Sequence, residues 1–385
     1  MHIAMIGTRG VPARYGGFET AVEEIGSRLA EMGHDVTVYC RNPGQSQREH
    51  LGMRLVNLPA VRRRSLETLS HTFLSIVHSM VRKPDVAVMF NAGNAPFIRL
   101  LRARGIPFAI HMDGLEWKRS KWQGNGARYY RWAERAAAGS GAALIADAHG
   151  IAEHLHQSYG VESYYIPYGA TIAYPRDDRL GELGLRAHEF HLVVARMEPE
   201  NHVDLIVGGY VASGSTRPLV VVGTAPYGSS FTAKIDGMAA RSGQVMMLGA
   251  LWDQELLDQL YGNARSYLHG HSVGGTNPSL LRALGSGAPV SAFDVNFNRE
   301  VAGPEAQYFH DVDSVAECIR VDDSASTRHE RGERGRRAVK NLYAWDRVAR
   351  DYEKMLQELM AQQADRRRRP RAWLRKPWRI TRRSP

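Results

Sequence analysis

Short runs of apolar residues alternate along the chain with longer segments whose apolar positions recur at helical spacing. In the first half, strands are predicted at residues 3–6, 36–39, 55–58, 86–89, 108–111, 143–146 and 164–166. A helix is predicted after the first strand from six apolar positions: Phe18, Ala21, Val22, Ile25, Leu29 and Met32. Gly33 is placed to end it. This alternation predicts a mostly parallel sheet with helices on both faces.

The same pattern starts again after a polar, proline-containing stretch at about residues 168–187. Strands are predicted at residues 191–194, 219–222, 246–248, 267–269 and 290–293, helices at 203–211 and 231–240, and a long last helix at about 346–361. The predicted class is therefore α/β, with two doubly wound Rossmann-like domains. We expect an N-terminal domain at 1–170, a linker at 171–187, a C-terminal domain at 188–345, a helix at 346–364 and a tail at 365–385.

The formal net charge of +10 belongs to the end of the chain. Ten basic residues lie there with no acid among them: Arg366, Arg367, Arg368, Arg369, Arg371, Arg375, Lys376, Arg379, Arg382 and Arg383. Subtracting these 10 from 50 basic residues leaves 40, against 40 acidic ones. Together with Trp373 and Trp378, this tail predicts binding to an anionic membrane surface. A solvated tail is an alternative, and nucleic acid is not expected because the neutral body carries no groove-reading motif.

The location follows from what the chain lacks. No apolar run approaches the length needed to span a bilayer, and the start resembles a strand entering a glycine loop more than a signal peptide. Cys40 and Cys318 fall in different predicted domains, which fits a reducing compartment. We expect a cytoplasmic protein, held peripherally on the inner face of the cytoplasmic membrane.

A second segment could contact lipid. Residues 66–81 place Leu66, Leu69, Phe73, Ile76, Val77 and Met80 on one helical face, and Arg62, Arg63 and Arg64 precede them. Basic residues at a helix start oppose the helix dipole, which suggests another use for them, such as binding lipid phosphates. An ordinary core helix after a basic loop fits equally well.

Two loops are candidates for binding an anion. The first, residues 7–19, reads GTRGVPARYGGFE and joins a strand to a helix start. It is neither G-x-G-x-x-G nor a Walker loop, which disfavours dehydrogenases and NTPases. The second, residues 271–281, offers Asn277 as an N-cap and Pro278 as the first helical residue. A diphosphate would fit there, but a capped ordinary helix fits the pattern as well.

A metal is not expected. Asp311 and Asp313 form a D-x-D pattern, but they precede the apolar pattern of a short helix, so capping is the favoured interpretation. The histidines show no ligand spacing.

Five segments, in order, carry a family resemblance: GTRGVPARYGGFE, LAEMGHDVTVYC, HMDGLEWKRSKW, ARMEPEN and HSVGGTNPSLLRALGSGAPV. Together they resemble the retaining family-4 glycosyltransferases of the two-Rossmann (GT-B) type, and more narrowly the bacterial rhamnosyltransferase-like subgroup. The resemblance spans about residues 3–355 and implies two domains facing a cleft, where ligands bind beyond the strand ends.

The resemblance also implies site residues. His111 would reach the donor sugar, Arg196 would neutralise the leaving diphosphate, and Asp113 would orient the acceptor hydroxyl. Donor-binding positions would be Gly16, Gly17, Asn201, Gly275, Thr276, Asn277, Ser279, Arg282 and Glu300. Asn201 stands where the family usually has a lysine, and Glu300 where it often has an acid.

One departure from the family pattern concerns two glutamates separated by seven residues. Their positions are Gly274 and Arg282 here. The second glutamate usually holds the nucleotide ribose, and an arginine cannot accept those hydrogen bonds, although it could contact phosphate.

The implied activity is transfer of a hexosyl group, with rhamnose favoured, from a dTDP- or UDP-linked donor to a lipid-linked glycan with retention. No cofactor beyond the substrate is expected, and no metal. Two alternatives remain: a non-catalytic, membrane-bound nucleotide-sugar-binding protein, and a different nucleotide-sugar enzyme such as an epimerase, which would need the dinucleotide fingerprint that the first loop lacks.

Overall fold

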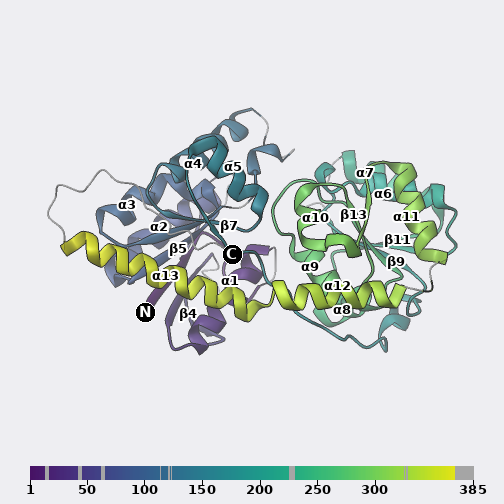
Figure 1. The fold of residues 1–385 in the computed structure, drawn as a ribbon, viewed down its shortest axis with the longest axis horizontal. Coiled ribbons are helices and arrows are strands. Elements are labelled where there is room, and N and C mark those ends of the chain that lie inside the picture. The colour runs from purple at the N-terminus through teal and green to yellow at the C-terminus, as the bar shows by residue number, and fades with distance from the viewer. Residues whose placement is uncertain are drawn as a thin grey trace. The chain divides into compact units, whose positions relative to one another are not determined.

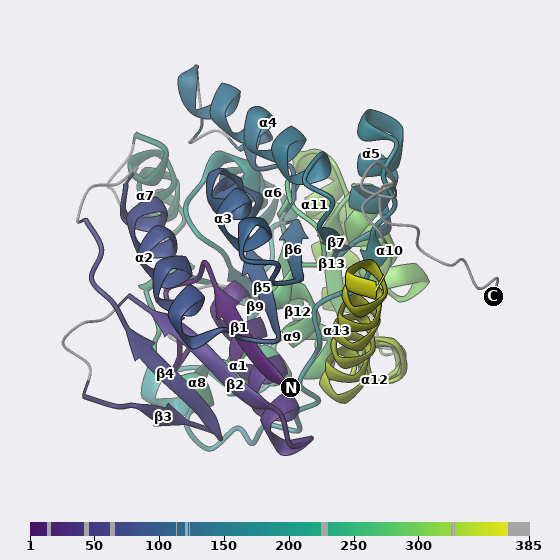
Figure 2. The ribbon, with the colours of Figure 1, turned by 90° about the vertical axis from the view of Figure 1, so that its left-hand side faces the viewer.

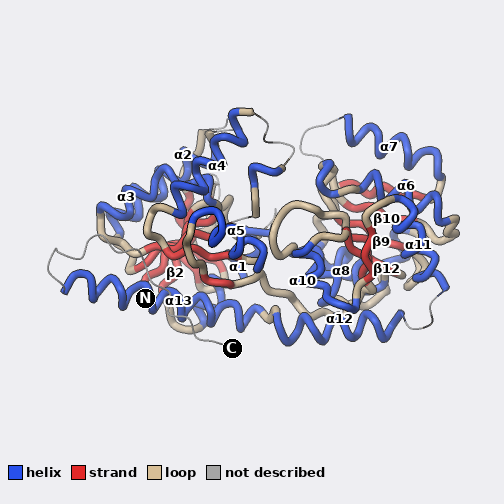
Figure 3. The backbone as a smooth tube through the Cα atoms, turned by 45° about the horizontal axis from the view of Figure 1, so that its top comes forward, coloured by secondary structure: helices blue, strands red, loops and turns tan. Residues whose placement is uncertain are grey.

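The computed structural model describes residues 1–13, 17–41, 46–61, 66–112, 114–119, 122, 124–224, 230–324, 326 and 328–368. The chain divides into two compact units (Figure 1). The first holds Met1–Lys118, Trp122–Tyr168 and the last helix, α13 (Trp345–Arg368), and the second holds Gly169–Ala344. Each unit contains its own parallel sheet flanked by helices (Figure 3), which confirms the predicted α/β class with two Rossmann-like domains.

The first unit is built on an eight-stranded sheet in the order β3-β4-β2-β1-β5-β6-β7-β8. Its strands are β1 (His2–Ile6), β2 (Asp35–Cys40), β3 (Glu49–His50), β4 (Met53–Asn57), β5 (Val86–Phe90), β6 (Phe108–Met112), β7 (Ala143–Ala146) and β8 (Tyr164–Tyr165). All neighbours pair in parallel except β3 with β4. Every strand predicted in this half is present. The short edge strand β3 was not predicted, because Glu49 and His50 carry no apolar signal.

Helices cover both faces of this sheet. They are α1 (Gly17–Glu31), α2 (Glu67–Arg82), η1 (Ala92–Phe97), α3 (Ile98–Ala103), η2 (Glu116–Lys118), α4 (Asn125–Ala138) and α5 (His149–Tyr159). Helices α1 and α13 pack together on one face, and α2, α3 and α4 lie on the other (Figures 1 and 2). This arrangement follows from right-handed crossovers, because the chain moves in opposite directions from β1 and from β4.

The last helix belongs to the core of the first unit, although the sequence places it after the second. Its residues Tyr352, Met355, Leu356 and Leu359 are buried. Polar contacts flank this apolar face: His34 Nε2 lies 2.9 Å from Glu353 Oε1, and Tyr164 Oη donates to Glu358 Oε2 at 3.0 Å. The helix runs beyond its predicted end to Arg368, so the first three arginines of the tail continue it.

The second unit has a six-stranded, fully parallel sheet in the order β11-β10-β9-β12-β13-β14. Its strands are β9 (His191–Val194), β10 (Leu219–Val222), β11 (Val245–Gly249), β12 (Ser266–His269), β13 (Val290–Phe293) and β14 (Gln307–Phe309). The five predicted strands are confirmed. Strand β14 was not predicted.

The helices of the second unit are η3 (Leu180–Leu183), η4 (Pro199–Asn201), α6 (Val203–Ser213), α7 (Ser230–Ser242), α8 (Gln254–Asn263), α9 (Pro278–Gly285), α10 (Asn296–Ala302), η5 (Gly303–Glu305), α11 (Val312–Ser324) and α12 (Arg328–Leu342). Asp311 Oδ1 accepts the backbone N–H of Ser314 at 2.8 Å, so this aspartate caps α11. In the described part of the chain, no helix combines the length and the apolar character that crossing a bilayer requires.

The stretch predicted as a linker packs against the second unit. Leu180 and Leu185 are buried, and Asn263 Nδ2 on α8 donates to the carbonyl oxygen of Arg176 at 2.8 Å. A β-carbon at Gly285 would overlap the carbonyl of Thr171. The segment is therefore held closely over α8 and α9.

We predict that truncating the apolar face of α13 destabilises the first unit. Leu356→Ala removes a fully buried side chain and should lower the free energy of unfolding by about 2 to 5 kcal/mol. Urea unfolding followed by circular dichroism measures this loss. The neighbouring Gln357→Ala, at an exposed position of the same helix, should change the stability by less than about 0.5 kcal/mol. Equal stability of L356A and Q357A would contradict the packing of α13 described here.

Candidate functional site

The loop after β1 lies tightly against neighbouring strands. Gly7 and Gly10 have φ angles of +107° and +104°, in the region that favours glycine. A β-carbon on Gly7 would overlap the carbonyl of Phe90, and one on Gly10 would overlap the side chain of Cys40. Packing against β5 and β2 is therefore a sufficient reason for both glycines.

Three amide groups of this loop donate to side chains of the same unit. The N–H of Arg9 donates to Glu19 Oε1 at 3.0 Å, and that of Ala13 to Glu23 Oε2 at 2.8 Å. The N–H of Gly10 donates to Thr8 Oγ1 at 3.2 Å. These three amides therefore already have acceptors and are not free to bind a phosphate. Gly17 begins α1, and the predicted Gly16 lies outside the described residues.

The carboxylate at the start of α1 sits in a buried polar cluster. Burial raises the pKa of Glu19, while the hydrogen bond from the Arg9 amide opposes that rise. Arg41 donates to the carbonyl of Gly7 at 3.3 Å, and burial lowers the pKa of its guanidinium. The first loop is therefore organised by side chains of its own unit.

His111 lies at the end of β6 and is almost fully buried among aromatic rings. Its ring centroid is 5.3 Å from that of Phe18, 5.7 Å from that of Phe90 and 5.4 Å from that of Tyr168. Burial lowers the pKa of His111 to about 3, so the imidazole is neutral near pH 7. Its Nδ1 has no hydrogen-bond partner in the described part of the chain. The predicted Asp113 lies outside the described residues.

In the second unit, two strand-end loops meet because β9 and β12 are neighbours in the sheet. The N–H of Ser272 donates to the carbonyl of Glu200 at 2.9 Å, and Ser272 Oγ donates to the same oxygen at 3.0 Å. His202 Nδ1 lies 2.8 Å from the carbonyl oxygen of Gly270. A β-carbon at Gly270 would overlap the carbonyl of Asn201. These contacts fix the loop after β9 against the loop before α9.

The start of α9 has the geometry predicted from sequence. Asn277 is the N-cap, with its side chain accepting the Ser279 N–H at 3.0 Å, and Pro278 is the first helical residue. Gly275 and Thr276 are buried just before it. Within the described residues, no acceptor pairs with the amide groups of residues 273–275. These amides lie just before the capped, positive end of α9.

Arg196 follows β9 and is partly exposed, with its Nη2 3.3 Å from Glu198 Oε2. The predicted Asn201 is buried and does not reach outward: its Nδ2 donates to the carbonyl oxygen of Arg196 at 2.8 Å. The structure thus gives Asn201 the role of holding the backbone that carries Arg196.

Two histidines at the end of β12 were not singled out from sequence. The rings of His269 and His271 stack with centroids 4.4 Å apart, and Tyr267 Oη lies 3.2 Å from His269 Nδ1. Burial lowers the pKa of His269 to about 3. It also places the pKa of His271 well below its ordinary value, with further lowering by neighbours that include His269 and Arg196. A His-Gly-His sequence directly after a buried strand is the signal that marks this position.

Two further residues were predicted to bind the nucleotide-sugar donor, Glu300 and Arg282, and they lie in different environments. Glu300 lies on α10, which packs against α9. Arg282 is engaged by α8: its Nε pairs with Asp258 Oδ1 at 2.7 Å, and its Nη1 and Nη2 donate to the side chain and the carbonyl of Gln254. The Arg282 guanidinium also lies over the ring of Tyr261, with 5.5 Å from Cζ to the ring centroid. Its donors are used in joining α8 to α9.

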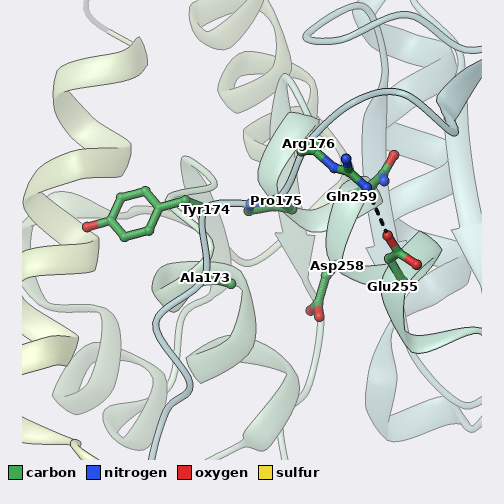
Figure 4. Close-up of a pocket in the computed structure, with 7 residues that line it drawn as sticks. All are labelled: Ala173, Tyr174, Pro175, Arg176, Glu255, Asp258 and Gln259. Atoms are coloured by element: carbon green, nitrogen blue, oxygen red, sulfur yellow. Dashed lines mark ion pairs between the residues drawn. The ribbon is translucent and has the colours of Figure 1, made fainter.

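A surface pocket of about 470 Å³ lies elsewhere in the second unit, between α8 and the stretch at 171–187 that was predicted as a linker (Figure 4). Its lining residues are Ala173, Tyr174, Pro175, Arg176, Glu255, Asp258 and Gln259. The Arg176–Glu255 ion pair spans it, with Nη2 and Oε1 3.6 Å apart. Tyr174 points away from the others, toward Arg336. None of the site residues predicted from sequence lines this pocket.

Comparison with known proteins agrees with this architecture. Residues 16–169 match the family model of the glycosyl transferase 4-like domain. No curated protein sequence matches the chain. The sucrose-phosphate synthase of Thermosynechococcus elongatus is 20% identical, with a TM-score of 0.78, and the match covers 94% of this chain and 99% of that one.

Two further structures are similar over nearly the whole chain. HepE of Anabaena, solved in complex with UDP, is 14% identical with a TM-score of 0.74, covering 93% of this chain and 100% of its own. WaaG, a glycosyltransferase involved in lipopolysaccharide biosynthesis, is 18% identical with a TM-score of 0.66, and the match covers 91% of this chain and 99% of WaaG. The chain therefore has the two-Rossmann (GT-B) fold, and its first half is similar to the glycosyl transferase 4-like domain.

We predict that the free energy of unfolding depends on pH because His111 is buried in its uncharged form. The pKa of His111 is about 3 in the folded chain, against a reference value of 6.5. Between these values the unfolded chain binds more protons, so acidification lowers the free energy of unfolding, by up to about 1.4 kcal/mol per pH unit from this group. His111→Phe keeps an aromatic ring without the titration. Between pH 7 and 5 it should lose less stability than the wild type in urea unfolding, and parallel losses would contradict the assignment.

Proposed function

We propose that the protein is a glycosyltransferase that moves a hexosyl group from a nucleotide diphosphate sugar to an acceptor with retention of configuration. The observation that carries this proposal is the start of α9. Within the described part of the chain, the amides of residues 273–275, just before the capped start of this helix, have no acceptor. Arg196, on the adjacent strand-end loop, supplies a cation in the same unit. A diphosphate is the ligand that this combination of donors suits.

The proposed chemistry needs these groups most at the transition state. The bond between the sugar carbon and the diphosphate oxygen breaks with its electron pair going to the diphosphate, so negative charge grows on that oxygen. Arg196 and the amides of residues 273–275 would stabilise this charge. The acceptor hydroxyl attacks the same face of the sugar, and its proton passes to the departing diphosphate oxygen. No protein nucleophile and no metal is required in this scheme.

We assign the sugar-side contacts to the first unit. A neutral imidazole can donate to, or accept from, a sugar hydroxyl without adding charge, which suits His111. Asp113 is proposed to orient the acceptor hydroxyl. In the second unit, Gly275, Thr276, Asn277 and Ser279 would form the donor-binding helix start, with Glu300 on the helix packed beside it.

The donor is proposed to be dTDP- or UDP-linked, with rhamnose favoured by the resemblance to the bacterial rhamnosyltransferase-like subgroup. The similar HepE structure contains UDP, which supports a pyrimidine nucleotide. The acceptor is proposed to be a lipid-linked glycan of a cell-surface polysaccharide. Ten basic residues in the final segment support a peripheral position on the inner face of the cytoplasmic membrane.

A non-catalytic, nucleotide-sugar-binding protein is the second candidate. The observation that favours it is Arg282, whose guanidinium is bound to Asp258 and Gln254 where a ribose-binding carboxylate would be expected from the family pattern. Both candidates require nucleotide binding, and only the first requires turnover.

A nucleotide screen tests the proposal directly. The thermal unfolding of the full chain is measured with dTDP, UDP and GDP, because stabilisation scales as RT ln(1 + [L]/Kd). We expect dTDP or UDP to raise the Tm more than GDP does. The purified protein is then incubated with dTDP-rhamnose and UDP-glucose and a soluble acceptor analogue. Binding without transfer or donor hydrolysis would favour the second candidate, transfer from UDP-glucose alone would refute rhamnose, and no binding at all would overturn the proposal.

We predict that Arg196 contributes directly to diphosphate binding. Arg196→Ala removes a charge-assisted contact and should weaken binding of the preferred nucleotide diphosphate by about 1.5 to 3 kcal/mol. Isothermal titration calorimetry measures the change in Kd. Arg337→Ala, at an exposed position on α12, removes the same charge from the chain and should leave Kd unchanged. An equal loss in both variants would show a general charge effect, and no loss in R196A would remove Arg196 from the site.

A further inference from the structure

Helix α2 is oriented with its polar side inward. Its fully buried residues are His71, Thr72, Ser75, Ile76 and Ser79. The hydroxyl groups among them are paired: Thr72 Oγ1 donates to Asn94 Oδ1 at 2.9 Å, and Ser75 and Ser79 donate to carbonyls of their own helix at 2.7 Å. Only Ile76 contributes a large apolar side chain to the core. The sequence had placed Ile76 on the same face as Phe73 and Val77, and this grouping is wrong.

The opposite side of α2 carries large apolar side chains in the open. Leu66, Phe73, Leu74, Val77 and Val81 are exposed, with Val81 at 76%. Their spacing keeps them within about one third of the helix circumference, so they form a continuous stripe. Single exposed apolar residues are ordinary, but a stripe along one helix marks a surface that another apolar medium covers. We call these five residues the α2 stripe.

The surroundings of the α2 stripe are cationic. Arg82 and Lys83 are exposed at its C-terminal end, and Arg99 and Arg102 are exposed on the adjacent α3. Arg104 reaches α2, with Nη2 donating to the carbonyl of Met80 at 3.3 Å. From residue 66 to 112 the sequence has 5 basic and 2 acidic residues, a difference of +3.

The other face of the first unit has the opposite charge. Helix α1 has four acids and one base, and residues 345–365 of α13 have five acids and three bases, a difference of −5 over both. The end of α13 reaches the cationic side, because Gln363 Nε2 donates to the carbonyl of Gly105, just after α3, at 3.1 Å. Arg366, the first arginine of the basic run, lies close enough to Arg102 for the two charges to interact. Figure 2 shows α2, α3 and α4 together on this face.

We propose that the α2 stripe inserts into the surface of an anionic lipid bilayer, with the arginines of α3 holding the headgroups. An apolar stripe bordered by cations is the pattern of a helix lying in a membrane interface. A second copy of the chain fits less well, because its own stripe carries the same cationic border and the like charges would meet. The inference builds on the membrane position proposed above, but its test needs no sugar transfer.

The two cysteines of the chain are both buried, which allows a selective probe. Val77→Cys in the full chain is labelled with the environment-sensitive fluorophore NBD. Val211→Cys, on α6 of the second unit, is the matched control, since Val77 is 42% and Val211 55% exposed. Vesicles of phosphatidylcholine with 30% phosphatidylglycerol should shift the emission of the probe at position 77 to the blue and raise it severalfold. The probe at position 211 should not respond, nor should either probe with pure phosphatidylcholine.

A second arm separates the stripe from the tail. Deleting residues 369–385 should reduce vesicle binding at low salt but leave the response at position 77 at saturating lipid. Phe73→Ser with Val77→Ser should lower by roughly tenfold the fraction of the full chain that stays bound to vesicles at 1 M salt, where charge attraction is screened. Val211→Ser should leave that fraction unchanged. Thermal unfolding in the absence of lipid verifies that each variant is folded.

Three results would overturn the inference. A wild-type chain that binds vesicles while position 77 stays silent would assign binding to the tail alone. Equal responses at positions 77 and 211 would show general adsorption. A response at position 77 that grows with protein concentration without vesicles would assign the stripe to a second copy. Absence of glycosyl transfer would overturn the proposed function and leave these fluorescence readouts as they are.

Discussion

A buried amide group needs an acceptor, and the two units meet this requirement differently at the helix that follows a central strand. At α1, the carboxylates of Glu19 and Glu23 take the amides of Arg9 and Ala13. At α9, Asn277 caps the helix, and the amides of residues 273–275 have no acceptor in the described part of the chain. Because an unpaired donor is costly unless water or a ligand satisfies it, the amides of residues 273–275 are available to water or to a ligand. In the first loop, the amides of Arg9 and Ala13 are instead held by side chains of the same unit.

The same logic explains how Arg196 is held. A single exposed arginine would sample many positions, but its backbone is held by the buried amide of Asn201, and Gly270 packs directly on Asn201. The bonds from Ser272 to the Glu200 carbonyl tie the two strand-end loops together. Arg196 and the amides of residues 273–275 are thus carried by two loops that are bonded to each other, an arrangement that under the proposed function would favour electrostatic stabilisation of a leaving group.

The strands and the α9 cap could be predicted from sequence because buried apolar runs and N-cap residues are local signals. Strand β3 could not, since Glu49 and His50 gain their pairing only from the partner β4. The orientation of α2 could not be predicted from the sequence for a different reason. A helical period indicates that a helix has two different faces, but it does not indicate which face packs against the core. Thr72, Ser75 and Ser79 fit the core because their small side chains have hydrogen-bond partners, Thr72 on η1 and the two serines on their own helix. Likewise, Asn201 was predicted to contact the nucleotide-sugar donor because of its position in the motif. Only the structure shows that its side chain bonds to the backbone of Arg196.

Arg282 illustrates how one substitution is absorbed by its surroundings. Its partner Asp258 lies on α8, and a glutamate at position 282 would place two carboxylates against each other there. Arg282 and Asp258 therefore form a local pair, and Arg282 also contacts Gln254 and the ring of Tyr261. Its donors face α8, whereas the free amides of residues 273–275 lie before the first turn of α9. Contacts to a diphosphate at the helix start and contacts to a ribose further along it are thus physically separable. Under the proposed function, Arg282 would therefore affect which nucleotide is held and how firmly, and would leave the diphosphate contacts at the helix start in place.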